Sequence, residues 1–386
     1  MTRHRTLLSR FASAAVSLIL LVALAACGGA EEEPSGAAED GGATPDVEEA
    51  APSPDEAPET EGESSEPAAP ETEAELVPLQ VAPPSPSIVA MAAFYVAEHE
   101  GYFEEEGADV DLVTQVSAAT LEAALVQGAL DIAGGSPDGF LVQLGQDPDL
   151  PFRCIATISL WPFRVMVPPE SPVQTAADLA GMRVGVPESS DVPRLEFMLL
   201  AAGLDQETAS SVEAIPVGGR EPAAIEMARE SIDAFMGSHV DQLAIENAGF
   251  PVRVIETVDV GSTYNSCMLV RAESLEDPEM RRGIEGFLRG LIRGSQVFYE
   301  EPERAIEILA EARPEAVSDP EQALEVLRAT DEVNRPTYEF EFTTTAEGWQ
   351  DLVEQFVDAG FIEESYDVSP YIDSSLVEEA WAEVNP

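Results

Sequence analysis

The sequence contains no lysine, and its charge is overwhelmingly of one sign. Its 19 basic residues are all arginines and stand against 74 acidic residues, which gives a formal net charge of −55. Without lysine, a Schiff base to a carbonyl substrate or to pyridoxal phosphate is excluded. A surface this acidic repels phosphate backbones, so we expect no nucleic-acid partner. Salt screens the self-repulsion of such a surface, and a salt-adapted host is therefore one hypothesis.

Cysteine and histidine are also scarce. The cysteines are Cys27, Cys154 and Cys267, and there are three histidines. Neither a cysteine cluster nor a histidine-rich loop occurs, so we expect no bound metal and no cofactor. No histidine has a cysteine or serine partner at a spacing typical of nucleophilic catalysis, so we expect no catalytic residue. Cys154 and Cys267 lie in apolar, strand-like runs, where a disulfide and two buried free thiols both remain open.

Only one long apolar run occurs, at residues 11–23, and it follows Arg3, Arg5 and Arg10. It is shorter than the roughly 20 residues that cross a bilayer. A positively charged start before a short apolar core predicts a processed export signal over residues 1–27. The run ends in the letters LAACG, residues 24–28, which resemble the lipobox of bacterial lipoproteins. That resemblance implies diacylglycerol attachment to Cys27 and a position on the outer face of the cytoplasmic membrane.

Residues 28–77 are almost entirely small, acidic or proline. They hold 17 acidic residues and no basic one. Such a segment buries too little apolar surface to offset the entropy of ordering, and its charges repel one another. We therefore predict a disordered acidic tether, which as a simple coil reaches about 40 Å from the membrane.

The remaining residues, 78–386, alternate between strand-like and helix-like segments, which predicts an α/β fold. The pattern breaks at Pro168-Pro169, restarts as a second strand–helix block and returns as a strand near Met268. From Pro278 onward it is helical, apart from an extended stretch at 338–343. We predict that residues 78–168 and 266–386 form one lobe, that residues 169–265 form the other, and that the protein is a monomer.

Four segments resemble one family, and they occur in the same order along the chain. They are YVAEHEGYFEEEGADV at 95–110, AALVQGALDIA at 123–133, SPVQTAADLAGMRVGV at 171–186, and a helix-to-strand step at 224–235 that ends in IDAF. Together they are similar to the sulfonate, nitrate and thiamine-pyrimidine group of substrate-binding proteins.

The resemblance implies a type II periplasmic-binding-protein fold, in which two α/β lobes are joined by two crossovers. The pattern of strands and helices places these crossovers near Pro168-Pro169 and residues 261–265. It also implies that lobe closure captures a small organic molecule or anion, such as a sulfonate, nitrate or a pyrimidine-type thiamine precursor. The partner implied is an ABC transporter permease with its ATPase. A ligand sensor that presents its closed form to a membrane receptor, and an enzyme on the same fold, are the alternatives.

Polar residues that follow each predicted strand are candidate ligand contacts, because ligands of open α/β sheets lie outside the carboxyl ends of the strands. Free N–H groups at helix starts can hold polar atoms there, and flat aromatic rings can wall a pocket. The candidates are Ser85, Ser87, Ser117, Thr120, Gly135 and Ser136 in the first lobe, Trp161, Tyr264 and Asn265 toward the crossovers, and Glu188, Ser189, Ser190, Gly219, Arg220 and Ser238 in the second lobe.

Alternatives remain open for these candidates. Serine and threonine at strand-to-helix junctions also cap helices, and Arg220 would serve equally in a surface ion pair. If Arg220 contacts the ligand, an anionic head group is favoured. If Glu188 and Asp191 contact it instead, a cationic or hydrogen-bond-donating heterocycle fits better.

Overall fold

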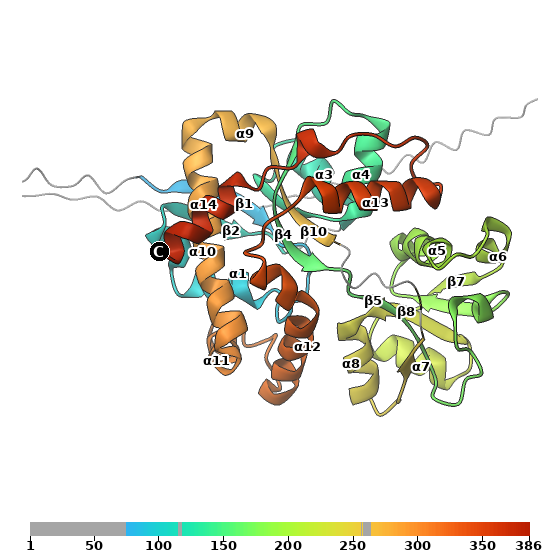
Figure 1. Ribbon diagram of the computed structural model, residues 1–386. Coiled ribbons are helices and arrows are strands. Elements are labelled where there is room, and N and C mark those ends of the chain that lie inside the picture. The colour runs from blue at the N-terminus through green and yellow to red at the C-terminus, as the bar shows by residue number, and fades with distance from the viewer. Residues whose placement is uncertain (1–74, 115–117, 256, 258–263) are drawn as a thin grey trace, which may run out of the picture. The chain divides into compact units, whose positions relative to one another are not determined.

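The computed structural model describes residues 75–114, 118–255, 257 and 264–386. The predicted signal and nearly all of the predicted tether lie outside these residues, as do Cys27 and Ser117. The described residues belong to one unit of the chain, Pro70–Pro386, and build two five-stranded sheets (Figure 1). None of the helices in this part of the chain combines the length and apolar character that a membrane crossing requires.

The first sheet has the strand order β2-β1-β3-β10-β4. β1 (Val77–Ala82) lies parallel to β2 (Ala108–Leu112) and to β3 (Ile132–Gly135). β10 (Tyr264–Arg271) lies antiparallel between β3 and β4 (Phe152–Leu160). Parallel strands end at one edge of a sheet, so the loops after β1, β2 and β3 share that edge.

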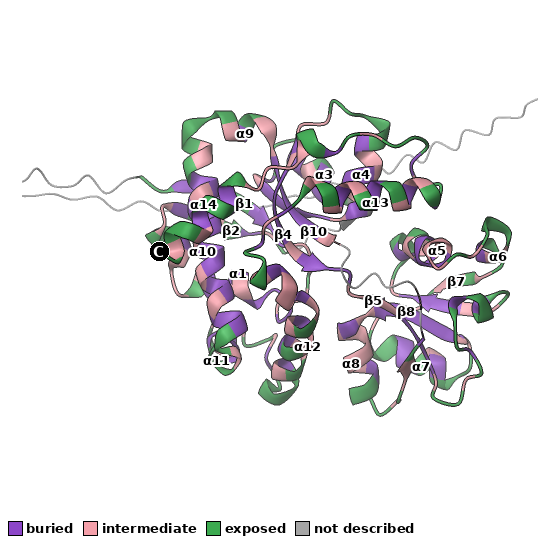
Figure 2. Ribbon diagram, in the orientation of Figure 1, coloured by how far each residue is buried: buried purple, intermediate pink, exposed green. Residues whose placement is uncertain are grey.

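Helices cover both faces of the first sheet. One face packs against α1 (Ala92–His99), α2 (Tyr102–Glu105), α10 (Pro278–Glu300), α11 (Pro302–Ala312), α12 (Pro320–Glu339) and α14 (Ser375–Val384). The other face packs against α3 (Ala118–Val126), α4 (Pro137–Gln146) and α13 (Ala346–Asp358). α9 (Ala272–Glu276) links β10 to α10, and a 3-10 turn (Ser369–Tyr371) precedes α14. Figure 2 shows the buried strands between helices whose outer surfaces are exposed.

The second sheet has the strand order β7-β6-β8-β5-β9. Its strands are β5 (Phe163–Val167), β6 (Arg183–Val186), β7 (Glu213–Pro216), β8 (Ala234–Ser238) and β9 (Arg253–Val254). One face packs against α5 (Val192–Ala201) and α6 (Gln206–Ser210), and the other against α7 (Glu221–Ala228) and α8 (His239–Asn247). Short 3-10 turns at Ala176–Leu179 and Ser189–Asp191 flank β6.

The first crossover between the sheets lies earlier than the sequence predicted. β5 pairs with β8 and β9 in the second sheet, so the chain crosses at Trp161 and Pro162, between β4 and β5. The predicted boundary after residue 168 is wrong, because Pro168-Pro169 follows β5, and β5 is already a strand of the second lobe. The return crossover lies between β9 and β10, where residues 258–263 are outside the described part.

The predicted extended stretch at 338–343 is also wrong. α12 continues to Glu339 with Pro336 inside it, and a tight turn follows. Glu341 and Phe342 both adopt positive φ angles there, 59° and 54°. Phe342 is 3% exposed and packs into the core beside α10, so burial of its ring accompanies the turn.

Cys154 and Cys267 form a disulfide, which decides a question that the sequence left open. Their Cα atoms lie 5.7 Å apart on the neighbouring strands β4 and β10. Both residues are fully buried on the sheet face that packs against α4 and α13. The strand pairing thus brings together two residues that are 113 positions apart.

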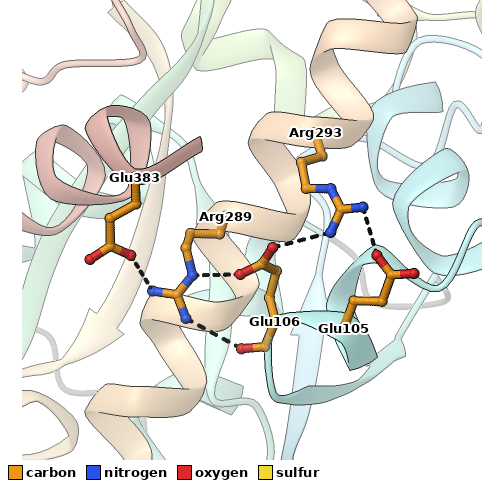
Figure 3. A network of polar contacts seen from close by, with 5 residues as sticks. All are labelled: Glu105, Glu106, Arg289, Arg293 and Glu383. Atoms are coloured by element: carbon orange, nitrogen blue, oxygen red, sulfur yellow. Dashed lines mark hydrogen bonds and ion pairs between the residues drawn. The ribbon is translucent and has the colours of Figure 1, made fainter. Parts of the chain in front are cut away.

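Glu106 joins α10 to the turn after α2 and stands at the centre of an ion-pair network (Figure 3). Its carboxylate accepts from Arg289 Nε at 2.8 Å and from Arg293 at 3.1 Å. Arg289 also pairs with Glu383 of α14 at 3.0 Å, and Arg293 with Glu105 at 2.6 Å. The network therefore ties the C-terminal helix to the first lobe through α10.

Replacing Glu106 with glutamine should lower the free energy of unfolding by about 2 kcal/mol, because two largely buried guanidinium groups lose a charged acceptor. Denaturant unfolding measures this loss. Glu105→Gln is the matched control: the side chain of Glu105 is 60% exposed, so its loss should cost less than about 0.5 kcal/mol. Equal costs for the two variants would contradict the central role of Glu106.

Candidate functional site

The serines after β1 and β3 cap local turns. Ser85 Oγ accepts from the backbone N of Ser87 at 3.2 Å, and Ser87 Oγ accepts from that of Ala90 at 3.4 Å. Ser136 is the N-cap of α4 and accepts from the N–H of Gly139 at 3.4 Å. The helix-capping alternative therefore accounts for the local contacts of all three candidates.

The other candidates of the first lobe are Gly135, Thr120 and Ser117. Gly135 is buried in β3, and a side-chain carbon there would lie 2.2 Å from Leu269 Cδ1. Glycine at position 135 therefore allows the Leu269 side chain of β10 to pack closely against β3. Thr120 is exposed on α3, and Ser117 lies outside the described residues.

In the second lobe, the turn after β6 carries two acidic residues, of which one is exposed and the other is buried. Glu188, Ser189 and Ser190 are exposed, whereas Asp191 is 8% exposed. The Asp191 carboxylate accepts from the backbone N of Glu188 at 3.1 Å and forms an ion pair with Arg194. Since Arg194 neutralises Asp191, this turn offers a ligand less negative charge than the sequence suggests.

Asp241 connects the loop after β7 to the turn after β8. One carboxylate oxygen accepts from the backbone N of Arg220 at 3.1 Å. The other accepts from the backbone N and the hydroxyl of Ser238, at 2.8 and 2.7 Å. A side-chain carbon on Gly219 would lie 2.5 Å from the first of these oxygens, so glycine is required for this approach.

Arg220 combines an unusual backbone conformation with a side chain that has no partner within the described ranges. Its φ and ψ angles are 58° and −128°, a region that costs a residue with a side chain about 1–3 kcal/mol. Among the arginines in the described ranges, its guanidinium alone forms no hydrogen bond, ion pair or ring contact within those ranges, and the residue is exposed. The surface ion pair that the sequence left open is therefore absent there.

Trp161 of the first crossover and Phe163, the first residue of β5, lie at the edge where β6 and β8 end. Phe163 pairs in register with Ser238, the last residue of β8. The rings of Trp161 and Phe163 meet edge to face at 5.5 Å, and the guanidinium of Arg194 lies 4.3 Å from the centre of the Phe163 ring. Trp161 is only 6% exposed, and its Nε1–H finds no acceptor in the described part of the chain.

Tyr264 and Asn265 begin β10 and are held by the first lobe. The Tyr264 hydroxyl lies 3.1 Å from Thr345 Oγ1, and its ring packs against Trp349 of α13 at 5.3 Å. Asn265 Nδ2 donates to Ser159 Oγ at 3.1 Å. Both candidates are thus fixed to neighbouring elements through their side chains.

The two lobes contact each other at two places through helices of the C-terminal tail. At the first, Phe197 of α5 stacks on Phe356 of α13 at 4.6 Å, within a cluster of buried apolar side chains that includes both lobes. At the second, His239 Nε2 of α8 lies 3.1 Å from Thr330 Oγ1 of α12. Residues of the C-terminal helices therefore form part of the contact between the lobes.

The sequence interpretation missed several of these residues. Asp241 carried a readable signal, because serine and an acidic residue three positions later match the spacing of a capping box. Arg194 likewise follows Asp191 at helical spacing. Thr330 and Phe356 carried no signal, since only the folded tail brings them to the second lobe.

Two other kinds of site receive no support. A cavity of about 30 Å³ between α1, α10 and α12 is lined mainly by apolar residues such as Phe94 and Phe298, and it has room for little more than one water molecule. Within the described ranges, no group of three or more histidine, cysteine or carboxylate side chains is arranged to hold a metal ion.

Comparisons with known proteins agree with this architecture. A formylaminopyrimidine-binding protein of Halalkalibacterium halodurans is 30% identical over 228 residues, which cover 58% of this chain and 66% of that protein. The riboflavin-binding protein RibY of Chloroflexus aurantiacus is 22% identical over 59% of this chain and 64% of its own length. The chain thus matches slightly less than two thirds of each relative.

A solved structure confirms the predicted fold class. The periplasmic aliphatic sulphonate binding protein SsuA of Escherichia coli superposes with a TM-score of 0.59 at 17% identity, over 79% of this chain and 99% of that one. The family model described as NMT1/THI5 like matches residues 89–305, more than half of the chain. The chain therefore belongs to the NMT1/THI5-like family of proteins.

Proposed function

We propose that this protein captures a small organic molecule or anion outside the cytoplasm and delivers it to an ABC transporter permease with its ATPase. The observation that carries the proposal is a pair of groups at the carboxyl edge of the second sheet that have no partner among the described residues: the buried N–H of Trp161 and the guanidinium of Arg220. Ligands of α/β sheets bind at such edges. Two of the relatives, a formylaminopyrimidine-binding protein and a riboflavin-binding protein, support a solute-binding role.

The same groups favour a planar ligand with an anionic or hydrogen-bond-accepting group. Phe163 and Trp161 supply flat rings, and the indole N–H of Trp161 has no acceptor among the residues that the structure describes. Asp191 is neutralised by Arg194, whereas the Arg220 guanidinium has no partner in the described part of the chain, so an anionic head group is favoured over a cationic one. The other serine and glycine candidates remain proposed contacts through the backbone groups of their turns.

A thermal-shift screen tests the proposal. Sulfonates, nitrate, pyrimidines and flavins are each added to the purified protein, and native mass spectrometry identifies any solute that co-purifies. A ligand that binds only the folded state at one hundred times its Kd stabilises it by about 2.7 kcal/mol, which raises Tm by several degrees. If no member of a broad solute panel changes Tm, the proposal is wrong.

Paired substitutions at Arg220 separate ligand binding from backbone strain. Arg220→Ala removes the guanidinium and keeps the strained φ, so affinity for an anionic ligand should fall about tenfold with stability unchanged. Arg220→Gly should lose the same affinity but gain up to about 1 kcal/mol of stability, because glycine tolerates this conformation. Calorimetry and denaturant unfolding measure the two effects. Unchanged affinity in both variants would exclude Arg220 from the site.

We also propose that the protein is a monomeric lipoprotein, with residues 1–27 as its signal, Cys27 as the lipidated residue and residues 28–77 as its tether. A buried disulfide supports an oxidising, extracytoplasmic location. Cys27→Ser should move the protein from the membrane fraction to the soluble fraction, since a single anchor residue carries the attachment. Fractionation and immunoblotting measure this, and a Cys27→Ser protein that stays with membranes would refute the anchor.

A ligand sensor remains the second candidate, because closed lobes present the same surface to a receptor as to a permease. A ligand-dependent uptake assay in cells that lack the chain distinguishes the two. Loss of uptake supports import, and normal uptake with loss of a ligand response supports sensing.

A further inference from the structure

Helix α8 of the second lobe and α12 of the first meet through buried side chains next to the crossover. His239, the first residue of α8, is 8% exposed, and its backbone N donates to the carbonyl of Pro162 at 3.1 Å. Its ring Nε2 lies 3.1 Å from Thr330 Oγ1 of α12. Val240, the next residue, packs against the buried cluster of the first lobe. His239 therefore lies at the contact between the lobes and beside the crossover that joins them.

The hydrogen bonds of Thr330 define which nitrogen of His239 carries the proton. Thr330 Oγ1 donates to the backbone carbonyl of Val326 at 2.8 Å, and a carbonyl can only accept. Thr330 must therefore accept from His239, so Nε2 is protonated, and in the neutral ring Nδ1 is not. Nδ1 is buried and has no hydrogen-bond partner among the residues that the structure describes.

The surroundings of the ring disfavour a positive charge. Burial, and then the nearby guanidinium of Arg164, lower the pKa of His239 to about 4. Arg164 itself is held by Gln242 at 3.0 Å. The charged residues of the elements packed around the ring are Arg164 on β5, Asp241 and Glu246 on α8, and Glu321, Glu325, Arg328, Asp331, Glu332, Arg335 and Glu339 on α12. Of these, Asp241 is engaged by Ser238, Asp331 by Arg335 and Glu325 by Asn247.

We propose that neutral His239 and Thr330 form a latch between the lobes and that protonation of His239 releases it, so that acidification opens the lobes. A proton on Nδ1 would create a buried N–H without an acceptor and a charge beside Arg164. Separation of α8 from α12 lets water solvate the ring and removes both penalties. The consequence for ligand affinity rests on the proposed function, but lobe opening itself does not require a ligand.

The direction of the pH effect follows from the two states. In the open state the solvated ring has the ordinary pKa of 6.5, and in the closed state the pKa is about 4, so the closed state binds fewer protons. The latch is therefore fully effective above about pH 6.5 and is lost as the pH falls toward 4. Between pH 7 and pH 5 these values weaken closure about twentyfold, in a range where most carboxylates stay ionised.

The distance between labels on the two lobes tests the latch without a ligand. Val126 of α3 and Ile225 of α7 are exposed, at 40% and 48%, and accept labels as Val126→Cys and Ile225→Cys in a Cys27→Ser background. Cys154 and Cys267 are bonded to each other and do not react. The ratio of open to closed protein should rise about twentyfold from pH 7 to pH 5, with an unchanged far-ultraviolet circular dichroism spectrum.

Three variants make the result decisive. His239→Gln keeps an N–H that reaches Thr330 but does not titrate, so its ratio should not change with pH. Thr330→Val should open the lobes at both pH values, and His99→Gln, at an exposed histidine of α1, should respond like the parent protein. A pH response that survives His239→Gln, or a parent protein that does not open at pH 5, overturns the latch. A working latch in a protein that binds no tested solute would overturn only the proposed function.

Discussion

Replacing Trp161 with phenylalanine should weaken ligand binding about tenfold and leave the fold intact. The indole N–H is buried and has no acceptor within the described ranges, so a ligand atom that accepts it would gain a hydrogen bond of about 1–1.5 kcal/mol. Phenylalanine keeps a flat ring against Phe163 and Phe197 but removes the donor. Isothermal calorimetry with the solute found by the thermal-shift screen measures the loss.

Two further variants separate the loss of the indole N–H at position 161 from the loss of the ring and from the loss of an indole N–H elsewhere. Trp161→Ala also removes the ring, which should lower affinity more than hundredfold and reduce stability by about 3–5 kcal/mol. Trp349→Phe is the control, because the Nε1–H of Trp349 already donates to Thr344 at 2.7 Å. It should lower stability by about 1 kcal/mol without changing affinity. Normal affinity in Trp161→Phe would remove the indole N–H from the site.

Removal of the disulfide should have the largest effect on stability. Replacing both Cys154 and Cys267 with alanine opens a loop of 113 residues in the unfolded chain. The chain-entropy model then predicts a loss of about 4–5 kcal/mol in the free energy of unfolding. Denaturant unfolding under oxidising conditions measures it.

Treatment with a reductant provides the matched comparison. The parent protein, reduced while unfolded, should show the same loss as the double variant, and the double variant should not respond to the reductant at all. A double variant as stable as the parent would show that the link between β4 and β10 contributes nothing beyond the sheet itself.

Local patterns were sufficient for the fold class but not for the lobe boundary. Strand–helix alternation predicted two α/β blocks and a helical tail, because hydrophobic periodicity is a local property of the chain. The boundary was placed at Pro168-Pro169 since prolines interrupt the pattern there. Whether a strand before such a break belongs to one sheet or the other depends on its hydrogen-bond partners, and β5 found them in β8 and β9.

The candidate site was predicted in position more than in detail. Ser85, Ser87 and Ser136 were expected at strand ends and lie there, but their hydroxyl groups cap turns. Arg220 was singled out because cations are rare in this sequence. That its guanidinium has no partner among the described residues depends on which carboxylates the fold brings close, and no pattern in the chain reveals that.

The sequence by itself determined the acidity, the export-like N-terminus, the alternation of strands and helices and the family resemblance, since these reside in composition and in neighbouring residues. Only the tertiary structure decided that Cys154 bonds to Cys267, that Glu106 holds Arg289 and Arg293, and that His239 meets Thr330. Each of these contacts joins residues roughly 90 or more positions apart. Such pairs are selected by the packing of whole sheets and helices, and hydrophobic periodicity within a segment carries no information about them.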